Sequence, residues 1–293
     1  MAPELISVAN SERFELTDNI WIERLDEELT EMIRHACQPP QHNIPDYPSF
    51  SHRYAFVSPM ADRENAPYEG MKNLLGAIAL SRLVHPTSTG LRYCVRIHNM
   101  NVPEHRRIEV ITYQGISPDI VTAPDIRDWL TEADALEVRK LMVWLPESNL
   151  MHRRTYHAYW NHEYTMRLAQ LDIRWIFVVS GLEALISIGE SDLKRQFKYR
   201  VFQLADKFGI QLTDDELERA YKVRSKLAHA ESFLSALHTL IPPLEQNDLY
   251  ERMERLLRVT VKRCLLDKQF GDIFTDGNTV EAHWPLPPIP RKT

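Results

Sequence analysis

The stretch TDDELERAYKVRSKLAHA, residues 213–230, decides how the C-terminal half of this chain folds. Thr213, followed three residues later by Glu216, matches a capping box, in which each side chain accepts a hydrogen bond from the other residue's backbone N–H. Apolar residues then recur at steps of three and four, from Leu217 through Tyr221 and beyond, as the buried side of a helix requires. The stretch therefore predicts an amphipathic helix that packs against other helices.

Helical patterns on both sides of this stretch predict its packing partners. Residues 156–188 are typical of one or two helices, with Gly189 as the stop and Ser191 as the next N-cap. Residues 193–208 and 248–266 each carry apolar side chains at steps of three or four. Short connections make such helices antiparallel neighbours, so we expect an all-α four-helix bundle.

The first half of the chain has a different pattern. Aromatic and β-branched residues alternate with other residues in three predicted strands, at residues 50–58, 91–98 and 107–113. Helical spacing marks residues 71–83 and 131–145, the second opening with an acidic capping box from Thr131 and Asp134. The pattern predicts an α+β domain, but no glycine-rich phosphate loop, GxSxG turn or metal-ligand spacing indicates its chemistry.

Charge and composition divide the chain in the same place. Residues 1–150 carry a net charge of -8 and residues 151–293 a net of +2, within a total of -6. The total gives no general electrostatic preference for nucleic acid or anionic membranes, because that signature is a basic excess. We expect an α+β domain at 1–150 with a sensor or regulatory role, a helical bundle at 151–283, and a Pro-rich tail at 284–293 that is extended over the surface or mobile.

Neither a disulfide framework nor a structural metal is indicated. The cysteines, Cys37, Cys94 and Cys264, are three in number, far apart and not part of a CxxC pair. The N-terminus lacks the basic start and apolar core of a signal peptide, and the most apolar stretch, 175–188, is shorter than the ~20 residues that span a bilayer. We therefore expect a cytoplasmic protein without a membrane segment.

Four charged or titratable residues stand where the packing pattern calls for apolar ones, or next to them. Arg224 shares the apolar stripe of its predicted helix, and His229 follows five residues later, rotated by ~140° and advanced by ~7.5 Å. Arg200 interrupts the stripe of residues 193–208, and Glu183 lies in an almost wholly apolar stretch. Buried charges are costly unless paired, so pairing Glu183 with Arg200 or Arg224 is favoured, and we predict that the four residues converge.

These residues resemble a known family. The segments SGLEALI with Glu183, KYRVFQLAD with Arg200, and YKVRSKLAHA with Arg224 and His229 resemble the Apea-like branch of the HEPN superfamily. The signature of that superfamily is an Arg, then four to six residues, then a His. The resemblance covers roughly residues 165–270, and Ser225 stands where the family often has Asn, Asp or another polar residue.

The resemblance implies an endoribonuclease that needs no metal or other cofactor and pools the motif residues of two copies across a homodimer. His229 would move a proton to or from the ribose 2′-hydroxyl or the leaving oxygen, because imidazole titrates near neutrality. Arg224 would stabilise the charge on the phosphoryl oxygens, and Glu183, Arg200 and Ser225 would support the pair. The product would be a 2′,3′-cyclic phosphate. Family analogy alone suggests a toxin or an antiviral defence effector.

A basic row on the last predicted helix offers an RNA contact. Arg255, Arg258 and Lys262 follow one another at steps of three and four, and could guide a phosphate backbone. Rows of this kind more often form a solvated face, and Glu251 and Glu254 lie close by. His152, His157 and His162 recur every five residues, an interval that winds around a helix and so disfavours a metal site.

Other interpretations stay open at this point. Arg224 can be an Arg that snorkels from its helix while His229 interacts with the helix C-terminal dipole, and Glu183 with Arg200 can be a structural ion pair. The helical half can then be a non-catalytic HEPN-type dimerisation or RNA-binding module. In a third interpretation the chain is a partner-binding scaffold that binds through its first half, where His52 and Arg53 are site candidates only if a pocket forms around them.

Overall fold

The computed structural model divides the chain into two compact units, which we call the N-terminal unit and the helical unit. The N-terminal unit comprises residues 1–81, 87–118 and 127–145, and the helical unit residues 82–86, 119–126 and 146–293. The structure describes residues 13–36, 54–58, 66–86, 93–98, 102–113, 130–144, 151–168, 171–189, 191–228 and 233–288. Among these residues, no helix is both long enough and apolar enough to cross a membrane.

The N-terminal unit combines short strands with helices. In chain order its elements are β1 (Arg13–Thr17), β2 (Ile20–Arg24), α1 (Glu27–Ala36), β3 (Tyr54–Val57), α2 (Ala66–Val84, whose last residues count with the helical unit), β4 (Tyr93–His98), the 3-10 turn η1 (Pro103–His105), β5 (Arg107–Tyr113), α3 (Glu132–Leu141) and the 3-10 turn η2 (Met142–Trp144). The order β1-β2-β3 makes one antiparallel sheet, in which Ile22 pairs with both Phe14 and Phe56. The strands β4 and β5 pair separately as an antiparallel ribbon.

The expected α+β organisation is confirmed at this coarse level. The three predicted strands correspond to β3, β4 and β5, and the predicted helix at residues 71–83 corresponds to α2. Thr131 and Asp134 form the predicted capping box at the start of α3. The sequence reasoning missed β1 and β2, which are only five residues each and so too short to show a clear alternation.

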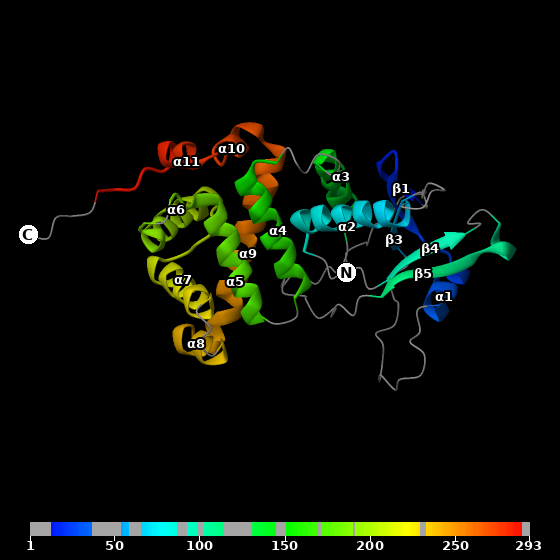
Figure 1. The fold of residues 1–293 in the computed structure, drawn as a ribbon, viewed down its shortest axis with the longest axis horizontal. Coiled ribbons are helices and arrows are strands. Elements are labelled where there is room, and N and C mark those ends of the chain that lie inside the picture. Colours follow the sequence, from blue (N-terminus) through cyan, green and yellow to red (C-terminus); the bar gives the residue numbers. More distant parts are fainter. Residues whose placement is uncertain are drawn as a thin grey trace, which may run out of the picture. The chain divides into compact units, whose positions relative to one another are not determined.

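The helical unit consists of helices joined by short connections (Figure 1). They are α4 (Arg153–Arg167), α5 (Leu171–Ile186), α6 (Leu193–Lys207), α7 (Asp214–Ala228), α8 (Phe233–Leu240), α9 (Pro243–Leu266), α10 (Lys268–Asp272) and α11 (Gly277–His283). The described part of this unit therefore contains more than the four helices expected, since residues 156–188 form two helices and α8, α10 and α11 are additional. A helical unit after an α+β unit is confirmed, and a specific HEPN arrangement stays a prediction.

Helix α5 occupies the centre of the helical unit and packs against α4, α6, α7 and α9 (Figure 1). Its side chains Val178, Val179, Leu182 and Leu185 are completely buried, which fits a helix that is apolar almost all round. Gly181 allows the close approach of α9, because a Cβ atom at this position would lie 2.7 Å from Cδ2 of Leu257. The bundle thus carries Glu183, one half-turn beyond Gly181, into its interior.

Helices α6 and α7 begin and end largely as expected. Thr213 and Glu216 form the capping box of α7, with each side-chain oxygen accepting from the other residue's backbone N–H at 2.7 and 3.2 Å. Gly209 has a φ of +63° after α6, a conformation that favours glycine. The N-cap of α6 is Asp192 and not Ser191, so that prediction is wrong by one residue.

The predicted Pro-rich tail needs a correction at its first residue, whereas residues 285, 287 and 288 are exposed, as expected for a segment that lies over the surface. Trp284, its first residue, is only 8% exposed and packs its ring against Phe274. The backbone N–H of Leu286 donates to Glu281, and the carbonyl of Pro287 accepts from Arg195. Residues 284–287 are therefore fastened to the helical unit, because the indole ring brings enough apolar surface to be drawn into the core. Residues 289–293 lie outside the described residues.

Candidate functional site

An ion pair between α5 and α7 joins two of the predicted site residues. Nη2 of Arg224 lies 2.9 Å from Oε2 of Glu183, and the two side chains are 30% and 10% exposed. Arg224 reaches this position because it shares a face of α7 with the buried residues Leu217 and Ala220, as the sequence pattern predicted. The predicted pairing of Glu183 with an arginine is confirmed, and its partner is Arg224.

Burial shapes the electrostatics of this pair. It raises the pKa of Glu183 above the ordinary glutamate value, and the charge of Arg224 opposes part of that rise. Tyr221, one turn before Arg224 on α7, also has a raised pKa, because it is partly buried and faces the negative charge of Glu183. The ring of Tyr221 packs against Phe197 on α6 with centroids 5.4 Å apart. Tyr221 thus belongs to the same site, and its position on the apolar stripe had marked it only as a core residue.

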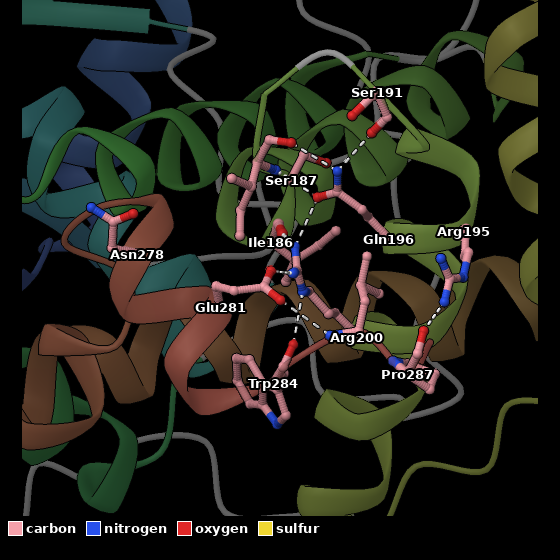
Figure 2. Close-up of polar contacts among 12 residues, drawn as sticks. Ile186, Ser187, Ser191, Arg195, Gln196, Arg200, Asn278, Glu281, Trp284 and Pro287 are labelled. Carbon is pink, nitrogen blue, oxygen red and sulfur yellow. Dashed lines mark hydrogen bonds and ion pairs between the residues drawn. The ribbon is translucent and has the colours of Figure 1, made fainter. Parts of the chain in front are cut away.

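Arg200 does not join this pair, so the predicted convergence is wrong for this residue. Its side chain is completely buried, and its Nη1 donates to the carbonyl of Ile186 at 2.9 Å and to Oε1 of Gln196 at 2.8 Å. Its Nε donates to the carbonyl of Trp284 at 3.1 Å, and its Nη2 forms an ion pair with Glu281 (Figure 2). The guanidinium therefore binds groups of the C-terminal segment and of the C-terminal end of α5.

Two arginines fix the C-terminal end of α5, close to Glu183. Nη1 of Arg154 donates to the carbonyls of Ala184, Leu185 and Ser187 at 3.2, 3.2 and 2.7 Å, while Arg200 binds the carbonyl between them. The last carbonyls of a helix lack partners within the helix and carry its negative dipole end, which cations stabilise. The two arginines therefore stabilise the last turn of α5, from which Glu183 reaches Arg224.

The other motif positions are placed as follows. Ser225 follows Arg224 on α7 and is partly buried. Helix α7 ends at Ala228, the residue directly before His229. His229 lies outside the described residues, as do His52 and Arg53. The Arg224-to-His229 geometry therefore stays a prediction.

The basic row on α9 differs from a free cationic face. Nε of Arg258 lies 3.0 Å from Oε1 of Glu254, and both side chains are largely buried. Arg255 is exposed, and Lys262 is partly buried with a partner of its own. Arg258 is thus occupied with a structural carboxylate, which weakens the prediction that the row as a whole binds RNA.

The carboxylate of Glu254 belongs to a buried polar network that the sequence reasoning missed. Nε2 of the completely buried His162 lies 3.0 Å from Oε1 of Glu254. Burial alone would raise the pKa of Glu254, but Arg258 and His162 outweigh it and hold this pKa below the usual value. The neighbouring residue Glu163, also buried, pairs with Arg82 and Arg167. The adjacent polar residues 162 and 163 on a helix that packs in the core were the available signal.

His152, the N-cap of α4, and the helix residues His157 and His162 have different surroundings, as their five-residue spacing predicted. His152 lies near Asp272 at 3.4 Å, His157 is exposed beside Tyr156, and His162 is buried against Glu254. Across the residues that the structure describes, no group of three or more His, Cys, Asp or Glu side chains is arranged to hold a metal ion.

Comparisons with family models, with curated proteins and with solved structures found no match to this chain. The described geometry is a partly exposed guanidinium that a largely buried carboxylate holds on its inner side. It lies one turn before the end of α7 and five residues before His229 in the sequence.

Proposed function

We propose that the helical unit is a metal-independent endoribonuclease whose catalytic residues are Arg224 and His229. The observation that carries this proposal is the Glu183–Arg224 ion pair. A guanidinium has five N–H donors, so one ion pair in a side chain that is 30% exposed leaves donors for a phosphate. Glu183 orients the arginine from the buried side, and the outer side of the guanidinium is available to substrate.

The chemistry requires one proton acceptor, one proton donor and a stabiliser of negative charge. The ribose 2′-oxygen attacks the adjacent phosphorus, the bond to the 5′-oxygen breaks, and a 2′,3′-cyclic phosphate and a 5′-hydroxyl end form. His229 takes the 2′-hydroxyl proton or delivers one to the leaving oxygen, and two copies in a homodimer supply both roles. Arg224 binds the phosphoryl oxygens with the geometry of a planar, bidentate donor.

The proposal is tested with purified full-length protein, total RNA and excess EDTA. We expect the wild type to cleave and both Arg224→Ala and His229→Ala to lose at least ~100-fold in rate, the usual scale for a group that transfers protons or stabilises charge. Lys268→Ala, which removes an exposed cation on α10 and is purified in the same way, controls for contaminating nucleases. Cleavage that persists in both variants, or that needs a divalent metal, would contradict the proposal.

The alternative is a non-catalytic dimerisation or RNA-binding module. It is favoured by one observation, since a buried glutamate explains an inward-facing arginine without any substrate. In that case wild type and both variants fold and dimerise equally and none cleaves RNA. A role as a toxin or antiviral effector, with the N-terminal unit as its regulator, belongs to the nuclease proposal and depends on the family resemblance.

A further inference from the structure

A groove of about 520 Å³ lies along α6, on a surface that the proposed active site does not use. This volume is within the range of ~300–1,000 Å³ that is usual for small-ligand sites. The groove is lined from α6, the start of α7 and the C-terminal segment by Lys194, Arg195, Lys198, Tyr199, Phe202, Gln203, Asp214 and Pro287.

The spacing of these residues places cations and aromatic rings on one side of the helix. Lys194, Lys198 and Phe202 follow one another at steps of four, and Arg195, Tyr199 and Phe202 at steps of four and three. Side chains at such steps lie on the same face of a helix. Both rows therefore begin with a lysine or arginine and end at Phe202.

The cations of the groove are only partly neutralised. Lys194 pairs with Glu218 at 2.7 Å, while Lys198 pairs with Glu218 at 3.0 Å and with Asp214 at 2.6 Å. Glu218 also pairs with Lys222 at 2.9 Å, so three lysines share two carboxylates. Arg195 donates to the carbonyl of Pro287, a neutral group, and Figure 2 shows its guanidinium turned toward that carbonyl. The groove therefore keeps a net positive charge.

The aromatic end of the groove has no evident packing role. Phe202 is 43% exposed on a helix in which the apolar residues Phe197, Val201 and Leu204 are completely buried. Tyr199, less than one turn away, also lines the groove and is partly buried. Exposed aromatic rings beside cations are the combination that binds single-stranded nucleic acid, because bases stack on the rings while the cations meet the phosphates.

We propose that this groove binds a nucleotide of a single-stranded RNA, with the base against Phe202 and Tyr199 and the phosphate on Arg195. The ligand identity rests on the proposed nuclease function, which it deepens by assigning a subsite. Asp214 in the groove and Arg224 are ten residues apart on α7, or about 15 Å along its axis. At ~3.4 Å per stacked nucleotide, an RNA of about five nucleotides spans that distance. The groove replaces the α9 row as the RNA contact.

Binding is measured without cleavage by using a 2′-O-methyl decanucleotide, which lacks the free 2′-hydroxyl, and fluorescence anisotropy with full-length protein. We expect Phe202→Ala to raise Kd by about tenfold, since stacking contributes ~1–3 kcal/mol per base and each 1.4 kcal/mol is tenfold. Phe202→Trp should retain affinity. Arg195→Ala should weaken binding. It should also lower the slope of log Kd against log salt concentration by about one, since one phosphate contact is lost. Two matched controls, Leu244→Ala and Lys268→Ala, change an exposed apolar side chain and an exposed cation elsewhere and should leave Kd unchanged.

The outcomes separate this inference from its rivals. An unchanged Kd in both Phe202→Ala and Arg195→Ala overturns it. If adenosine monophosphate binds as tightly as the decanucleotide, the groove holds a free nucleotide and the assignment to RNA is overturned. If inorganic polyphosphate competes equally well, base stacking is overturned. Groove-dependent binding in a protein that cleaves no RNA supports the groove and contradicts only the nuclease proposal.

Discussion

At the residue scale, the two inward-facing arginines of α6 and α7 have opposite roles. Arg200 is completely buried and all of its described partners are internal, so it stabilises the fold. Arg224 has one internal partner and is partly exposed, so it combines a fixed position with free donors. The difference in exposure makes Arg200 a structural residue and leaves Arg224 as the candidate for the proposed chemistry.

The burial of Glu183 makes a pH-dependent prediction. Its pKa is raised in the folded state, so the unfolded chain loses the proton first as the pH rises above about 4.5. The folded state then binds more protons than the unfolded one, and the contribution of Glu183 to the free energy of unfolding falls with rising pH. Urea unfolding of the wild type and Glu183→Gln between pH 4 and 7 should show the wild type losing stability relative to the variant.

The Arg224→Ala background provides the control for that series. Without the guanidinium, the opposing effect of Arg224 on the pKa of Glu183 is lost, so the loss of stability between pH 4 and 7 should be larger. A stability difference between the wild type and Glu183→Gln that does not vary with pH would contradict the assigned cause of the pKa shift.

The buried position of Arg258 leads to a second prediction. Arg258→Met leaves the buried carboxylate of Glu254 with a single partner, His162, and we expect a loss of about 3 kcal/mol in the free energy of unfolding. Arg255→Met, one turn earlier on the same helix and exposed, is the matched control and should cost less than ~0.5 kcal/mol. Equal effects of the two substitutions, measured by denaturant unfolding, would show that Arg258 is an ordinary surface residue.

At the element scale, the C-terminal segment supports the Glu183–Arg224 pair indirectly, by binding Arg200 at the end of α5. Helix α11 and Trp284 supply Glu281 and a backbone carbonyl to Arg200, which with Arg154 holds the end of α5. Glu183 lies one turn before that end, so we expect the geometry of the Glu183–Arg224 pair to depend on residues about a hundred positions further along the chain. The connection is through helix α5 and not through direct contact.

A conservative substitution tests this connection. Arg200→Lys keeps the charge but not the planar set of donors, so one ammonium group replaces the three nitrogens that contact the carbonyls of Ile186 and Trp284 and the carboxylate of Glu281. We expect a loss of about 3–5 kcal/mol in the free energy of unfolding, the scale for disrupting a buried charge network. Arg195→Lys, five residues earlier and partly exposed, should be nearly neutral. Thermal unfolding of the two variants should therefore differ by many degrees, and similar melting temperatures would contradict the role of Arg200.

At the scale of the whole molecule, local patterns predicted the helices better than their partners. The capping boxes at Thr131 and Thr213 and the apolar steps of α6 and α7 are local signals, and the structure contains them. The burial of Arg200 was also predictable, because it interrupts an apolar stripe. Its partner Glu281 was not, because it lies 81 residues away on a short helix with no pattern that points to Arg200.

The same limit applies to the site. An inward-facing charge shows in a sequence because neighbouring positions are apolar, so Glu183 and Arg224 were identifiable. The groove on α6 was not identifiable from the sequence, because the C-terminal segment and α7 also form part of its lining. The spacing of its cations on α6 alone is the same as on any solvent-exposed helix face. Partners that are distant in the chain depend on tertiary packing, which periodicity does not encode.

The most direct test of the proposed nuclease activity uses a DNA oligonucleotide that contains a single ribonucleotide, incubated with the purified protein in EDTA. We expect one cut by the wild type, 3′ of the ribose, with a 2′,3′-cyclic phosphate on one product and a 5′-hydroxyl on the other. Arg224→Ala and His229→Ala should leave the oligonucleotide intact while retaining the helical circular dichroism of the wild type. Cutting at deoxyribose positions, a 5′-phosphate end, or the same cut by both variants would contradict the proposal.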